Sequence, residues 1–323
     1  MKNILISGGC GFVGRNMVKR LAQDPNNRIL FIDDLSVGEH PDVWLKKEKK
    51  MQEGNICTYC SDGRLIFIEN DFRQVLFNLN SDSEFLKKEY NLDFKKFNDV
   101  FHFAAIVGGR AMIDGDPIMV ALDLSIDSEF FYWISRHKPD RVLYPSSSAA
   151  YPVDLQTDGG AIALSETDID FKQMGQPDMT YGWTKLTGEF LAQITAKHYG
   201  VSIACIRPFS GYGEDQNLTY PIPAIAKRAA LKEAALIKAQ NDSTAVSNKL
   251  RKQVTHDGKS PLSQRQADLI TTLANKTARR SLGYKRTKGV KSVTQSEAIA
   301  AFPKQPNVPS TRGGNFSKED IDG

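Results

Sequence analysis

SGGCGFVG, residues 7–14, places four glycines between a short apolar run and a stretch with helical spacing. The apolar run at 2–7 has the pattern of a buried parallel strand, and a second such run follows at 28–34. Between the two runs, Val13, Met17, Val18 and Leu21 recur at helical spacing. Strand, glycine turn, helix and strand together predict a βαβ unit with a right-handed crossover.

The glycine turn has the spacing of a dinucleotide-binding loop, because Gly8, Gly11 and Gly14 fit GxxGxxG. Glycines there allow a tight turn and a close approach to a pyrophosphate, and the helix N-terminus stabilises the phosphate charge. The turn therefore predicts cofactor contacts from the three glycines and from Phe12 and Val13 between them.

An acidic residue ends the second predicted strand. Asp33 lies 19 residues past Gly14, where a carboxylate accepts a hydrogen bond from a ribose hydroxyl. Because an acid repels a 2′-phosphate, the pattern predicts NAD and not NADP as the cofactor. Asp34 is the neighbouring alternative.

Further apolar runs predict a doubly wound parallel α/β sheet of the Rossmann type, since they alternate with helical or polar stretches. The additional strand candidates are 65–69, 100–106, 141–144 and 201–207. The polar, Lys-rich segment 38–63 is long for a connection, and we interpret it as a surface insertion with one short helix near 43–50.

Tyr181 and Lys185 place a phenol and an ammonium one helical turn apart on the same face. A cation in that position stabilises a phenolate, which is what a tyrosine needs to act as a general base. Upstream, Ser146, Ser147 and Ser148 follow a predicted strand whose end belongs to the same edge of the sheet. Their hydroxyls suit a reacting oxygen, although a structural turn or a helix cap explains a serine run equally well.

These pieces resemble the extended short-chain dehydrogenase/reductases, and within them the NAD-dependent epimerase/dehydratase group that acts on nucleotide sugars. The resemblance covers residues 1–230. The matching motifs, in chain order, are 7–14, Asp33, Asn70-Asp71-Phe72, His102-Phe-Ala-Ala105, 146–151, 181–185 and 207–213.

The resemblance implies roles for particular residues. Asp71 and Phe72 would flank the adenine, and Ala104 and Ala105 would line the dinucleotide. Tyr181, Lys185 and a serine would form the catalytic triad, and Tyr181 and Lys185 would also contact the cofactor. Counting four residues back from Tyr151 selects Ser147, with Ser148 as the second choice.

The residues after that serine sort the branches of the family. In the family that the chain resembles, the 4,6-dehydratases have an Asp-Glu pair directly after the serine, and other branches have a Glu or a Cys in this segment. This chain has Ser148 and Ala149 at the two positions after Ser147. The resemblance therefore implies an epimerase similar to the UDP-glucose 4-epimerases, with a nucleotide-sugar substrate and a homodimer. Two alternatives are an NAD-dependent sugar dehydrogenase or reductase and a non-catalytic NAD-binding protein.

Two departures set the chain apart from that pattern. Asp123 stands near the place where the family usually keeps an Asn on the cofactor side. Past residue 230 the family's substrate-domain motifs are absent, which leaves a divergent lid, an unrelated segment or a shifted or truncated reading frame as explanations. We therefore predict two parts, an NAD-binding domain at 1–230 and an atypical region at 231–323 that is partly helical and partly disordered.

Composition separates the same two parts. Residues 1–230 hold 25 Lys and Arg against 30 Asp and Glu, whereas 231–323 hold 17 against 8 and only three aromatic residues. Apolar side chains are too sparse there for a substantial core. We predict helices at 231–255, 262–282 and 292–302 and an unstructured end. Without aromatic or binding motifs, the basic charge favours a solvated surface over nucleic-acid binding.

The remaining features predict a cytoplasmic protein that contains no metal. The N-terminus lacks the features of a signal peptide, and no apolar run approaches the roughly 20 residues of a membrane span. The four cysteines indicate free thiols in a reducing compartment. Cys57 and Cys60 have zinc-knuckle spacing without a second pair, so we interpret them as incidental, and His102 as a core residue.

Overall fold

The computed structural model describes residues 1–106, 110–156, 163–209, 211–213, 215–218, 220–255 and 264–281. The chain divides into two compact units, Met1–Lys227 and Arg228–Gly323.

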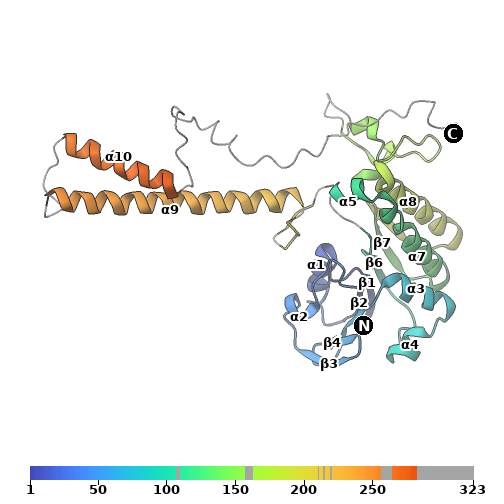
Figure 1. Ribbon diagram of the computed structural model, residues 1–323. Helices are drawn as coiled ribbons and strands as arrows, with labels where there is room; N and C mark the ends of the chain where they lie inside the picture. The colour runs from blue at the N-terminus through green and yellow to red at the C-terminus, as the bar shows by residue number, and fades with distance from the viewer. Residues whose placement is uncertain are drawn as a thin grey trace. The chain divides into compact units, whose positions relative to one another are not determined.

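The described part of the first unit is built on one eight-stranded sheet in the order β3-β4-β5-β2-β1-β6-β7-β8 (Figure 1). The pairs from β5 through β2, β1, β6 and β7 to β8 are parallel, and the pairs of β3 with β4 and of β4 with β5 are antiparallel. This architecture confirms the predicted doubly wound sheet. The strands are β1 Lys2–Ser7, β2 Asn27–Asp33, β3 Lys49–Glu53, β4 Ile56–Tyr59, β5 Leu65–Glu69, β6 Asp99–His102, β7 Arg141–Pro145 and β8 Ile203–Ile206.

Alternate strand residues feed two separate cores, as the period of two in a strand requires. Leu5, Leu30 and Ile66 pack with α3 (Phe72–Ser81), α7 (Asp123–His137) and α8 (Met179–Tyr199). Their neighbours Ile4, Phe31 and Phe67 pack on the other face with α1 (Phe12–Leu21) and α2 (Pro41–Trp44). The central strands are thus buried on both faces, which explains why they are continuous apolar runs in the sequence.

The insertion between β2 and β5 differs from its prediction. Only Pro41–Trp44 is helical, and Lys49, expected in the helix, begins β3. The β3–β4 hairpin turns through Gly54 at φ +56° and extends the sheet antiparallel to β5. Cys57 and Tyr59 of β4 are buried in the core on the α2 side of the sheet. Their burial favours a strand here, whereas the polar residues around them predict a surface segment.

Short helices complete the first unit, and the ends of two strands differ from their predictions. β6 stops at His102 and not at 106, and β8 runs only from Ile203 to Ile206. β8 lies at one edge of the sheet, and Ile206 is 43% exposed. The short helices are α4 Phe85–Tyr90, α5 Arg110–Gly115 and α6 Pro117–Ala121, with 3₁₀ turns η1 Ser148–Ala150, η2 Val153–Gln156 and η3 Glu166–Asp168.

The second unit contains most of α9 (Pro221–Thr255) and all of α10 (Gln264–Ser281). Helices were predicted at 231–255 and 262–282, and α9 begins earlier, at Pro221. Within the described part of this unit the buried apolar side chains are Ala239, Ile270 and Ala274. The predicted helix at 292–302 and the predicted unstructured end lie outside the described residues.

Candidate active site

The glycine turn after β1 brings backbone against backbone. Gly8 has φ +64°, and a Cβ on it would lie 2.6 Å from the backbone nitrogen of Ala104. A Cβ on Gly14 would lie 2.0 Å from the carbonyl oxygen of Gly8, so only glycine lets α1 start this close to the turn. The first N–H groups of a helix have no partner within it, and Gly11 brings no side chain to cap them. The turn therefore has the form of an anion-binding cradle, bordered by Phe12 and Val13.

Asp33 closes one side of this cradle. It is 9% exposed, its Oδ2 accepts a hydrogen bond from the Cys10 amide at 2.9 Å, and its Oδ1 accepts one from Leu35 at 2.9 Å. Burial raises the pKa of the Asp33 carboxyl, although these backbone hydrogen bonds oppose the shift. Asp34, the alternative, is exposed and accepts from Ser36 in a local turn, so Asp33 is the residue tied to the glycine turn.

β5, which lies next to β2, and β6, which lies next to β1, bring the other predicted cofactor residues to the same carboxyl edge. Asp71 caps α3 and accepts from the Arg73 amide at 2.8 Å, whereas Phe72 is buried in the core. Ala104 follows β6, and its amide donates to Ser7 Oγ at 3.1 Å; Ala105 is half-buried beside it.

Ser147 follows β7 at the edge of the sheet. It is 9% exposed, and its Oγ accepts a hydrogen bond from the Ala149 amide at 3.1 Å. The hydroxyl therefore caps η1, as the structural interpretation of the serine run predicts, and its own proton remains for another acceptor. Ser148, the second choice, is half-buried within η1.

Tyr181 and Lys185 share one face of α8, as their spacing predicts, with the Lys185 Nζ 5.8 Å from the centroid of the Tyr181 ring. Tyr181 is half-buried, whereas Lys185 is 4% exposed. A Cβ on Gly182 would lie 2.3 Å from the Ala149 carbonyl oxygen, so the start of α8 presses against η1. This contact brings the segment of Tyr181 to the segment of Ser147.

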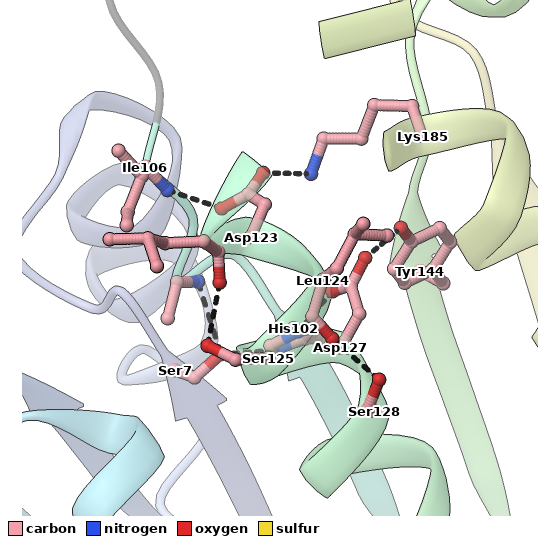
Figure 2. A network of polar contacts seen from close by, with 12 residues as sticks. Ser7, His102, Ile106, Asp123, Leu124, Ser125, Asp127, Ser128, Tyr144 and Lys185 are labelled. Atoms are coloured by element: carbon pink, nitrogen blue, oxygen red, sulfur yellow. Dashed lines mark hydrogen bonds and ion pairs between the residues drawn. The ribbon is translucent and has the colours of Figure 1, made fainter. Parts of the chain in front are cut away.

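The partner of Lys185 is a residue that sequence reasoning did not connect with it. Lys185 Nζ lies 3.1 Å from Asp123 Oδ2, and Asp123 Oδ1 accepts from the Ile106 amide at 2.5 Å (Figure 2). Burial opposes the charged form of Lys185, but the carboxylates of Asp123 and Asp127 raise its pKa. Burial raises the pKa of Asp123 even though Lys185 acts in the opposite direction.

A buried polar network lies beneath this ion pair (Figure 2). His102 Nε2 is 3.1 Å from Asp127 Oδ1, its Nδ1 is 2.8 Å from Ser7 Oγ, and Tyr144 donates to Asp127 Oδ2 at 2.6 Å. His102 is thus a core residue with both ring nitrogens partnered, which confirms its interpretation. The sequence signal for Asp127 is its position four residues after Asp123, on the apolar face of a helix.

Sequence reasoning also missed two ion pairs beside the site. Arg207 Nε and Nη2 bind the two carboxylate oxygens of Glu189 at 2.8 and 2.7 Å, which ties the end of β8 to α8. Arg15 of α1 lies 2.9 Å from Asp215 and holds the segment after β8 against the start of α1. Neither pair has a local sequence signal, because its partners are far apart in the chain.

The described residues hold neither a cluster suited to a metal ion nor a helix suited to span a membrane. No cluster of three or more His, Cys, Asp or Glu side chains there has the arrangement of a metal site. In the described part of the chain, every helix is too short or too polar to cross a bilayer.

Comparison with protein families gives a match over most of the chain. Residues 4–246 match the NAD dependent epimerase/dehydratase family. A Methanocaldococcus jannaschii protein described as uncharacterized is 26% identical over 66% of this chain and 57% of its own length. A Bacillus subtilis protein described as an uncharacterized UDP-glucose epimerase is 24% identical over 66% of this chain and 58% of its own length. The match thus spans less than two thirds of these relatives.

Solved structures share the fold at lower identity. A dTDP-glucose 4,6-dehydratase from Bacillus anthracis in complex with NAD has a TM-score of 0.52 at 17% identity, covering 72% of this chain and 62% of its own. A Thermus thermophilus UDP-glucose 4-epimerase in complex with NAD has a TM-score of 0.51 at 17% identity, covering 70% and 61%. Because a dehydratase and an epimerase match equally well, the likeness supports the fold and does not separate the two reactions.

Proposed function

The chain belongs to the NAD-dependent epimerase/dehydratase family, and on that premise we propose that it is an NAD-dependent nucleotide-sugar epimerase. The observation that carries the proposal is the Tyr181–Lys185 pair, held against the Ser147 segment at the carboxyl edge that also bears the glycine turn. In open α/β sheets this edge is where ligands bind.

The residues of the glycine turn fit NAD. The cradle that added Cβ atoms at Gly8 and Gly14 would fill suits a pyrophosphate, and Asp33 suits a ribose hydroxyl. We assign the remaining contacts to Gly11, Phe12, Val13, Asp71, Phe72, Ala104, Ala105, Tyr181 and Lys185. When bound, the nicotinamide supplies a reversible hydride acceptor.

The chain's own groups supply the acid–base chemistry in this proposal. Tyr181, as phenolate, takes the proton of a sugar hydroxyl and returns it after the keto-sugar has turned over. Lys185 stabilises the phenolate and holds the cofactor ribose. Ser147 donates its hydroxyl proton to the reacting oxygen, since its oxygen already accepts from Ala149.

Side chains beside Ser147 favour epimerisation over elimination. Ser148 and Ala149 occupy the positions after it, so η1 carries no carboxylate to remove or deliver the proton of a dehydration. A sugar epimerase needs only Tyr181, Lys185, Ser147 and the cofactor. An NAD-dependent dehydrogenase or reductase uses the same groups but needs cofactor added for every turnover.

A panel assay tests the proposal. Purified protein is incubated with UDP-, GDP-, CDP- and dTDP-sugars, with and without added NAD⁺, and the products are separated by chromatography. We expect interconversion of one epimer pair without net NADH. Tyr181→Phe should lower turnover by roughly 10²–10⁴-fold while NAD remains bound. Net NADH formation would indicate a dehydrogenase, and full activity of Tyr181→Phe would overturn the assignment.

A second candidate function follows from the composition of the C-terminal part. The described residues of Arg228–Gly323 bury few side chains, as expected if this part does not complete a substrate pocket. Stoichiometric NAD binding without turnover of any sugar would favour a non-catalytic NAD-binding protein. We further propose a homodimer, on family resemblance, and a cytoplasmic location, on the four free cysteines. Light scattering during size-exclusion chromatography tests the oligomeric state.

A further inference from the structure

We infer that Asp123 is a positioning residue that holds the Lys185 ammonium and shares its charge, so that the pH at which Tyr181 acts as a base is set by the ion pair. This inference rests on the proposed roles of Tyr181 and Lys185. Its test is therefore built on a measurement that does not require turnover.

Each carboxylate oxygen of Asp123 has one close partner (Figure 2). Oδ1 accepts from the Ile106 amide after β6 at 2.5 Å, and Oδ2 lies 3.1 Å from Lys185 Nζ. The side chains of Asp123 and Lys185 are 1% and 5% exposed, so water does not compete for the pair. The hydrogen bond from the main chain after β6 thereby orients the Asp123 carboxylate toward the Lys185 ammonium and restricts the conformation of the lysine side chain.

The charged and titratable groups that face Lys185 come from four elements. Asp123 and Asp127 come from α7, Tyr181 from the preceding turn of α8, and Tyr144 from β7, with its ring centroid 5.8 Å from Lys185 Nζ. His102 of β6 reaches the group through its 3.1 Å contact with Asp127. Two carboxylates therefore face one ammonium, and Tyr220 is a further titratable group that interacts with Tyr181.

This balance has a consequence for Tyr181. A lone buried ammonium favours the phenolate of a neighbouring tyrosine, whereas a carboxylate in contact with that ammonium disfavours it. Because Asp123 contacts Lys185 directly, it cancels part of the attraction that Lys185 exerts on the Tyr181 oxygen. A neutral amide at position 123 would remove the cancellation, and Tyr181 would then lose its proton at lower pH.

Asp123→Asn removes the charge at nearly unchanged side-chain shape. Asparagine has one carbonyl oxygen, which can accept either from the Ile106 amide or from Lys185, and its NH2 group then faces the other donor. A matched control is Asp99→Asn, because Asp99 is also buried and ion-paired, with Arg141 at 2.7 Å. Asp99 begins β6, at the opposite edge of the sheet from the site.

The experiment follows the carbon-13 resonance of tyrosine Cζ as a function of pH, in labelled protein as purified and again with NAD⁺ added. The Tyr181 signal is identified as the one missing from Tyr181→Phe. We expect Asp123→Asn to move the titration midpoint of this signal to lower pH by about one unit. Asp99→Asn should leave the midpoint unchanged. An unchanged or higher midpoint in Asp123→Asn would overturn the inference, whether or not any sugar turns over.

Two further readouts complete the test. Should Asp123→Asn fail to fold, Asp127→Asn removes the other carboxylate facing Lys185 and must still lower the midpoint, by less, because Asp127 also binds His102 and Tyr144. If the panel assay finds a substrate, the acidic limb of kcat/KM must move in the same direction as the resonance. A limb that stays in place while KM rises would indicate a merely structural role and overturn the inference.

Discussion

The two halves of the sheet's carboxyl edge are held together by different kinds of contact. Around β1, α1 and β2, backbone lies directly against backbone, and the Asp33 carboxylate accepts from two main-chain amides. Around β7, α8 and β8, side-chain ion pairs join the elements, with Lys185 bound to Asp123 and Arg207 to Glu189. Added atoms should therefore destabilise the first half, and removal of one partner of a buried ion pair should destabilise the second half.

The largest effect should come from breaking an ion pair in the catalytic half. Glu189→Ala removes a carboxylate whose side chain is 4% exposed and leaves the Arg207 guanidinium without a carboxylate, with hydrogen bonds only to Tyr151 and the Glu166 carbonyl. A largely buried charge that loses its counter-charge is costly, so we expect a loss of about 3 kcal/mol in the free energy of unfolding, measured with urea.

Glu84→Ala is the matched control for that variant. Glu84 forms an exposed pair with Lys88 at 3.9 Å, with both side chains 61% exposed. Surface pairs contribute little, and a change below about 0.5 kcal/mol is expected. Equal losses in the two variants would contradict the view that the buried pair of Glu189 and Arg207 holds the catalytic half together.

Adding a methyl group in the cofactor half should have the next largest effect. The Cβ of Gly14→Ala would lie 2.0 Å from the Gly8 carbonyl oxygen, so α1 must move away from the turn. We expect a loss of about 2 kcal/mol, with weaker NAD binding in an equilibrium titration. Gly115→Ala is the control, since a Cβ there meets nothing within 4 Å; a similar loss in both would show that the close approach is unimportant.

The same contrast explains how much the sequence predicts. Backbone contacts of the cofactor half depend on glycine spacing and strand ends within one βαβ unit, so residues 7–14 and Asp33 are readable as a pattern. The β3–β4 hairpin was misread because its buried Cys57 and Tyr59 sit among polar residues whose composition favours a surface segment.

The catalytic half is predictable only in part. Tyr181 and Lys185 lie on one helix, so their spacing places them on one face. Asp123 is 62 residues away from Lys185, and no local pattern connects them. Two elements must first pack before a carboxylate on one can meet an ammonium on the other, which is tertiary information.

The smallest expected effect is a difference between the two halves in how the free energy of unfolding depends on pH. Burial opposes ionisation of Asp127, but hydrogen bonding to His102 and the charge of Lys185 lower its pKa, whereas burial raises the pKa of Asp33. A depressed pKa contributes stability that is present above the unfolded value near 3.9 and is lost as pH falls through the folded value. A raised pKa has the opposite effect, because ionisation then costs stability and acid relieves that cost.

Unfolding free energies of Asp127→Asn and Asp33→Asn, each relative to wild type, test these signs between about pH 7 and about pH 3. The advantage of wild type over Asp127→Asn should shrink as the pH falls, and its advantage over Asp33→Asn should grow. Constant losses from altered hydrogen bonding do not affect these slopes. Slopes of the same sign would show that the two carboxylates are stabilised in the same way, because only opposite shifts in pKa give opposite dependences on pH.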